Sequence, residues 1–130
     1  MNIQKFTQKS MQAVEGCEKL AYEYGNQEIE QEHLLYSLLT LEDSLILKLI
    51  EKMEIQKEHF TARAKQAVEK RVKVQGGQVF MGKDLNKVLI GAEDEAKQLG
   101  DEYVSVEHLF LGMLRNPNRE IAQIWKEYGI

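Results

Sequence analysis

An internal repeat with an offset of 75 residues constrains the fold more than any other feature of the sequence. Sliding the sequence against itself by this offset aligns identical residues, which include Gly16, Gly25, Glu32, His33 and Leu34 with Gly91, Gly100, Glu107, His108 and Leu109. Between these identities, most apolar residues of one copy align with apolar residues of the other. Each copy is therefore expected to form the same structural unit. A unit of this size buries its apolar face poorly alone, and the two copies should therefore pack face to face around one core. The seam between them is then a natural groove.

The apolar spacing within each copy is that of helices. Over residues 6–24 apolar side chains follow one another in steps of three and four, and Gly25 supplies a stop. Similar patterns predict helices over 34–41, 45–53 and 60–72, and no stretch alternates convincingly with the period of a strand. The predicted fold is all-α, with two pseudo-symmetric repeats of a small helical bundle.

The repeat also divides the chain. We assign repeat one to residues 1–73, a linker to 74–82 and repeat two to 83–130, all within one domain that spans 1–130. The fourth helix of repeat one would map beyond Ile130. Repeat two is therefore expected to lack its last helix, and the chain is expected to be the front of a longer protein.

Composition narrows the function classes. The 130 residues are 43% hydrophobic and 29% charged, as in a soluble folded domain. No apolar run is long enough to suggest a membrane-spanning helix, and the first residues do not resemble a secretory signal peptide. The cytoplasm is the expected location. The net charge of −4 argues against a nucleic-acid partner. The segment 57–73 holds six bases and two acids, and without interleaved aromatic residues it is expected to form a solvated helical face.

Two patterns resemble catalytic or cofactor-binding motifs, but their surroundings argue against these roles. The glycines and lysine of 77–83 have the spacing of a phosphate-binding loop, but Asp84 stands where serine or threonine would hold magnesium. Cys17 lies on an apolar helical stripe, which favours packing over reactivity, and it has no second thiol for a disulfide or zinc. We expect no cofactor and no metal in this domain.

The two Glu-His pairs at 32–33 and 107–108 invite an acid-base or metal interpretation. Each pair opens an apolar helix, where glutamate favours the helix dipole and histidine can bond locally, and no second ligand stands at helical spacing. A structural role is favoured, and no catalytic residue is predicted. A free-standing helical enzyme that uses the two histidines remains a third functional interpretation.

The repeat motifs resemble the duplicated amino-terminal domain of the Clp ATPases, over nearly the whole chain. The resemblance lies in Glu-His-Leu-Leu at 32–35 and Val-Ser-Val-Glu-His-Leu-Phe-Leu-Gly-Met-Leu at 104–114. Phe6-Thr7, the run at 96–105 and the Gly-Gly-Gln-Val-Phe linker are more similar to the disaggregase branch, ClpB, than to the protease-coupled branch. The double repeat then corresponds to the duplicated helical motif of that family.

The resemblance implies a set of binding residues. In that family a threonine, an aspartate and a glutamate are linked to the handling of aggregates, and the matching positions here are Thr7, Asp101 and Glu107. Three apolar neighbours would form the adhesive surface of the groove: Phe6, Leu89 and Val104. Each polar residue also has a structural interpretation, as a helix N-cap, a turn residue and a first-turn acid respectively. Glu95 and His108 replace the family's usual leucines, so the groove is expected to be more polar and its affinity weak.

The resemblance also implies a function without catalysis in this domain. It suggests capture of unfolded or aggregated polypeptides and their transfer to AAA+ modules in cis, within a full-length homohexamer that uses ATP and magnesium; the isolated domain is expected to be a monomer. The alternative is an adaptor-docking domain of a protease-coupled Clp unfoldase. Neither interpretation involves nucleic acid or a membrane.

Overall fold

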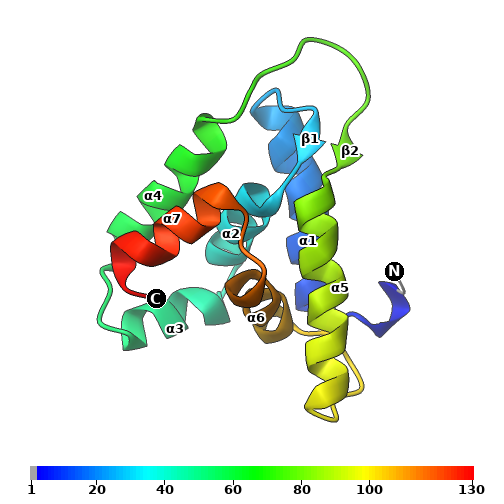
Figure 1. Cartoon of the computed structure of the whole chain (residues 1–130), viewed down its shortest axis with the longest axis vertical. Helices are drawn as coiled ribbons and strands as arrows, with labels where there is room; N and C mark the ends of the chain where they lie inside the picture. The colour runs from blue at the N-terminus through cyan, green and yellow to red at the C-terminus, as the bar shows by residue number, and fades with distance from the viewer. Residues whose placement is uncertain (1–2) are drawn as a thin grey trace.

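The computed structural model describes residues 3–130 and shows an almost entirely helical fold (Figure 1). Along the described chain the elements are a 3-10 turn at Ile3–Lys5, α1 (Gln8–Glu23), β1 (Glu28–Ile29), α2 (Gln31–Thr40), α3 (Leu45–Lys52), α4 (Lys57–Glu69), β2 (Phe80–Met81), α5 (Lys83–Gln98), α6 (Val106–Arg115) and α7 (Arg119–Tyr128). The prediction of an all-α fold built from two helical repeats is confirmed. Within the described residues, no helix combines the length and the apolar character needed to cross a membrane.

The offset of the repeat relates the helices of the two halves. The bounds of α5 are those of α1 moved by that offset, and α6 corresponds to α2 in the same way. The positions of α7 correspond to those of α3 with one added residue at each end. Among the helices described, α4 has no counterpart in the second half.

Short extended segments of one half pair with segments of the other half. β1 and β2 form a parallel pair in which Ile29 lies opposite Met81, and an isolated bridge joins Phe6 to Val104. The repeat relates the two pairs: Ile29 is equivalent to Val104, and Met81 is equivalent to Phe6. The segment that leads into the first helix of each repeat therefore pairs with the segment that precedes the second helix of the other. A strand of two residues is too short to show alternation, so these pairs carry no signal in the sequence.

α2 lies at the centre of the molecule, in contact with every other α helix described (Figure 1). Its Leu34, Leu35 and Leu38 are fully buried. α4 crosses over α2 and reaches α7, where the ring of Phe60 stacks on Trp125 with centroids 6.5 Å apart. One face of α2 is thus buried by α4.

Candidate functional site

The histidines of the two Glu-His pairs complete capping boxes at the starts of α2 and α6. The backbone N–H of Glu30 donates to Nδ1 of His33 at 2.9 Å, and Nε2 of His33 lies 2.9 Å from Oδ1 of Asn26. Because Nδ1 accepts, Nε2 carries the proton and donates to Asn26. His33 thereby ties the start of α2 to the loop after α1, and the predicted structural role is confirmed for this residue.

His108 repeats this arrangement in the second half with one chemical difference. The backbone N–H of Ser105 donates to its Nδ1 at 2.9 Å, and its Nε2 lies 2.8 Å from Oδ2 of Asp101. A carboxylate therefore stands where repeat one has the amide of Asn26. The structure places Asp101 in the loop between α5 and α6, half exposed and held by the histidine. The structural role predicted for the second histidine is confirmed as well.

Burial of His33 predicts a dependence of stability on pH. Burial, followed by the nearby charge of Arg71, lowers the pKa of His33 from 6.5 to about 4. Between these values the unfolded chain binds a proton that the folded chain does not, so the free energy of unfolding falls as the pH is lowered through this window. The full effect is about 3 kcal/mol.

Urea unfolding of the wild type and of His33→Gln from neutral pH down to about pH 4 tests this. The difference between the two stability curves should shrink as the pH falls, because only the wild type loses the contribution of a neutral histidine. Other titrating groups, including Glu30, whose pKa burial raises, are present in both proteins and cancel in the difference. Parallel curves would contradict the prediction.

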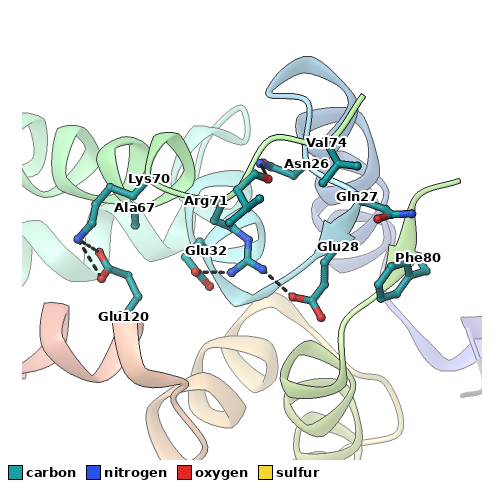
Figure 2. Close-up of a pocket in the computed structure, with 11 residues that line it drawn as sticks. Asn26, Gln27, Glu28, Glu32, Ala67, Lys70, Arg71, Val74, Phe80 and Glu120 are labelled. Carbon is teal, nitrogen blue, oxygen red and sulfur yellow. Dashed lines mark hydrogen bonds and ion pairs between the residues drawn. The ribbon is translucent and has the colours of Figure 1, made fainter. Parts of the chain in front are cut away.

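A first cleft of about 510 Å³ lies where the end of α4 meets β1 and the segment before β2 (Figure 2). Arg71 projects into it and donates from Nη1 to Glu32 and from Nη2 to Glu28, both at 2.7 Å. The side chain of Glu32 is only 5% exposed, and that of Arg71 20%. This cleft is thus centred on an ion pair that is already formed within the chain.

The expectation of a solvated basic face over 57–73 is wrong for its arginines. Arg63 is 11% exposed and bonds Glu120 at 2.9 Å and Glu127 at 2.7 Å, while Arg71 is paired as described above. The acidic partners lie in the other repeat, in β1 or in α2, far away along the chain, so local composition could not reveal them. Within the same helix Lys65 is exposed, as the sequence suggested.

The apparent phosphate-binding loop is filled by a carboxylate. Gly82 is the N-cap of α5, and the backbone N–H of Asp84 donates to Oε2 of Glu30 at 3.0 Å. The other carboxylate oxygen accepts the N–H of Gln31 at 2.9 Å. One glutamate thus caps two helices, and it occupies the Asp84 amide at the start of α5, where an anion could otherwise bind.

Cys17 is a buried core residue. Cys17 is 1% exposed, its Sγ lies 3.4 Å from the carbonyl of Ala13, and burial raises the pKa of its thiol. The predicted packing role is confirmed. Across residues 3–130, His, Cys, Asp and Glu side chains do not gather in a group of three that could hold a metal ion.

A second cleft, of about 430 Å³, brings together two of the predicted binding residues, Thr7 and Glu107. It lies between the start of α1, the loop between α2 and α3, and the start of α6. Thr7 is the N-cap of α1 and accepts the N–H of Ser10, whereas Glu107 points from the first turn of α6 and is exposed. Leu41 and Leu45 provide apolar lining, and Leu45 is 47% exposed. We call this space the Thr7–Glu107 cleft.

The predicted apolar surface needs correction. Phe6, Leu89 and Val104 are 4%, 0% and 3% exposed, so their side chains belong to the core and present no adhesive surface. Phe6 and Val104 are buried because their backbones pair across the two halves, and Leu89 because it lies on the buried side of α5.

Glu95 and His108 do not make the clefts more polar either. Both side chains are buried; Glu95 pairs with Arg115, and neither residue lines the two clefts. The apolar residues that line or extend the Thr7–Glu107 cleft were missed: Leu41, Leu45, Leu49 and Met53. The spacing of four between the last three was the available signal, because it forms a second apolar row beside the buried Ile46 and Ile50.

Comparisons with known proteins agree with this architecture. The family model described as "Clp repeat (R) N-terminal domain" matches residues 5–128. "Chaperone protein ClpB" of Nitratidesulfovibrio vulgaris is 40% identical over 136 residues, which cover 100% of this chain and 16% of the relative. The same chaperone of Porphyromonas gingivalis is 36% identical over 129 residues, 99% of this chain and 15% of the relative. The chain therefore spans about a sixth of the length of these relatives.

Solved structures share the fold at low sequence identity. The Hsp104 N-terminal domain from Candida albicans has a TM-score of 0.85 at 21% identity, covering 97% of this chain and 83% of that one. A ClpV N-domain in complex with a VipB peptide has a TM-score of 0.74 at 20% identity, covering 95% of this chain and 79% of that one.

Proposed function

Because the chain belongs to the Clp repeat N-terminal domain family, we propose that it captures exposed segments of unfolded or aggregated polypeptides. In a longer protein it would pass them to AAA+ modules of a ClpB-like disaggregase, a cytoplasmic homohexamer that uses ATP and magnesium. The ClpB chaperones that it resembles over its whole length support this proposal. The domain itself then acts by binding, without a catalytic site.

The observation that carries the proposal is the composition of the Thr7–Glu107 cleft. Residues about a hundred positions apart meet there, beside the exposed Leu45, with a carboxylate at the rim. An apolar client side chain can lie on Leu41 and Leu45 while the carboxylate of Glu107 accepts backbone N–H groups of the client. With few apolar contacts and the cost of ordering the client, affinity should be about micromolar or weaker. Weak binding suits a domain that must release its client.

A permanently unfolded model protein, such as reduced and carboxymethylated α-lactalbumin, provides the binding test. We expect Leu45→Gln combined with Glu107→Gln to weaken binding to the domain about tenfold, measured by fluorescence anisotropy. The matched control combines Tyr22→Gln with Glu18→Gln, an exposed pair on α1 that does not line this cleft. Equal affinities of wild type and cleft variant, at matched stability, would contradict the proposal.

Adaptor docking is the second candidate, as in a protease-coupled Clp unfoldase. It is favoured by the likeness of fold to the ClpV N-domain that was solved with a VipB peptide. Tight, stoichiometric binding of one folded protein, with no measurable binding of unfolded chains, would support this function instead.

A further inference from the structure

β2 lies at the margin of the molecule (Figure 1), and in the part of the chain that the structure describes only β1 pairs with it. The N–H groups of Phe80 and Gly82 donate to the residue before β1 and to β1 itself, at 2.9 and 2.8 Å respectively. Neighbouring residues of a strand direct their main-chain groups to opposite edges, so those of Val79 and Met81 point away from β1. Within residues 3–130 no hydrogen bond occupies them.

The side chains of this edge strand are apolar and exposed. Phe80 is 51% exposed and Met81 is 41% exposed. Phe80 reaches the rim of the first cleft (Figure 2), which Val74 also lines. A strand added to the outer edge of β2 would place its own side chains beside these, as cross-strand pairs do within a sheet. The edge therefore offers both unpaired main-chain groups and apolar surface.

The sequence around this edge lacks the residues that usually prevent strand addition. Proteins protect edge strands with charged side chains, with proline or with a covering element. The segment 74–82 contains no charged residue and no proline, and every residue from 72 to 81 except Val79 is exposed. Because the edge carries no charge, an uncharged apolar segment is the partner that matches it.

The length of the edge distinguishes between kinds of partner. The backbone runs from 78 to 82 without a turn or bend, and five residues of strand span about 17 Å. A contact of this length buries far less than the roughly 1,000 Å² of a stable interface between folded proteins. It is too small to hold a second folded copy of the chain. An unfolded polypeptide, in contrast, can add one strand here and dissociate again.

We propose that the outer edge of β2, residues 78–82, binds an extended apolar segment of a client polypeptide by strand addition. The inference rests on the proposed function, because it assigns a second contact to the client that the Thr7–Glu107 cleft captures. Main-chain groups of the client pair with those of Val79 and Met81, and a client side chain packs beside Phe80. Main-chain pairing depends little on sequence, which suits the capture of unfolded chains of different composition.

A labelled heptapeptide of alternating threonine and valine is the probe, titrated into the 130-residue domain. The matched peptide carries methyl groups on four central amide nitrogens, two on each edge, so its side chains are unchanged but its main-chain donors are lost. We expect methylation to weaken binding about tenfold, as for the loss of two hydrogen bonds. Equal affinities of the two peptides would overturn the inference. Because this comparison uses the wild-type domain, it does not depend on the folding of a variant.

Two substitutions of Met81 separate the main chain from the side chain in the domain. Met81→Pro removes the outward N–H but leaves the bonds of β2 to β1, because an edge strand accepts proline where its N–H faces solvent. Met81→Ala keeps the N–H and is the matched control. We expect the proline variant to bind the unmethylated peptide about fivefold more weakly than the alanine variant, with equal circular dichroism. Equal affinities of the two variants would contradict strand addition.

Reduced and carboxymethylated α-lactalbumin separates failure of this inference from failure of the proposed function. Met81→Pro should weaken its binding about threefold. If Met81→Pro has no effect but Leu45→Gln with Glu107→Gln weakens binding, strand addition is overturned and the proposed function stands. If neither variant weakens binding, both are overturned. Concentration-dependent dimers in sedimentation, abolished by Met81→Pro, would assign the edge to a second copy of the chain and also overturn the inference.

Discussion

Arg71→Met is expected to lower the free energy of unfolding by about 3 kcal/mol, because it leaves the carboxylate of Glu32 buried with only Asn118 as a partner. Glu32 is 4% exposed, so its carboxylate has little contact with water that could replace the lost interaction. Urea unfolding monitored by circular dichroism measures the change.

Two further variants separate the ion pair from general effects on α4. Lys65→Met removes a positive charge from the exposed side of the same helix and should change stability by less than about 0.5 kcal/mol. Glu32→Gln added to Arg71→Met should restore at least half of the loss, because no buried charge then remains. A loss in Arg71→Met no greater than that in Lys65→Met would contradict this account.

Phe60→Ala is expected to cost about 4 kcal/mol, the larger of the two effects. Phe60 is fully buried, stacks on Trp125 and meets the edge of Tyr128, so the substitution leaves a cavity between α4 and α7. A loss of this size is a large share of the 5–15 kcal/mol typical of a single domain, and unfolding should start well below the wild-type midpoint in urea.

Phe80→Ala is the matched control for this prediction, because the ring of Phe80 is 51% exposed. Its expected cost is below about 1 kcal/mol, since most of its apolar surface already contacts water. Similar losses in the two variants would mean that the packing of α4 on α7 contributes little to stability.

The repeat offset was the most informative signal in the sequence, because it relates features that no local pattern connects. It predicted that His33 and His108 play one shared role, and both cap a helix start. Helical spacing also predicted the all-α fold. These inferences depend on the periodicity of apolar residues and on short-range bonding, which the sequence records directly.

Features that depend on distant contacts could not be predicted. Arg63 and Arg71 lie in a run of bases, yet their acidic partners come from residues at least 39 positions away. The resemblance implied that Phe6, Leu89 and Val104 form the adhesive surface of the groove, but all three are buried, because the packing of whole helices decides whether an apolar residue faces the core or the solvent. The apolar row on α3 was hidden for the same reason, because the exposure of its side chains depends on how whole helices pack.

The pairing of β1 with β2, and of Phe6 with Val104, means that neither repeat can form these pairs within itself. In a single half-length ancestor, the leading segment could find its pairing edge only on another molecule. Two such molecules related by a twofold axis would each complete the other, as in an isologous homodimer. When both copies lie in one chain, the same association becomes intramolecular, so its strength no longer depends on the concentration of the protein.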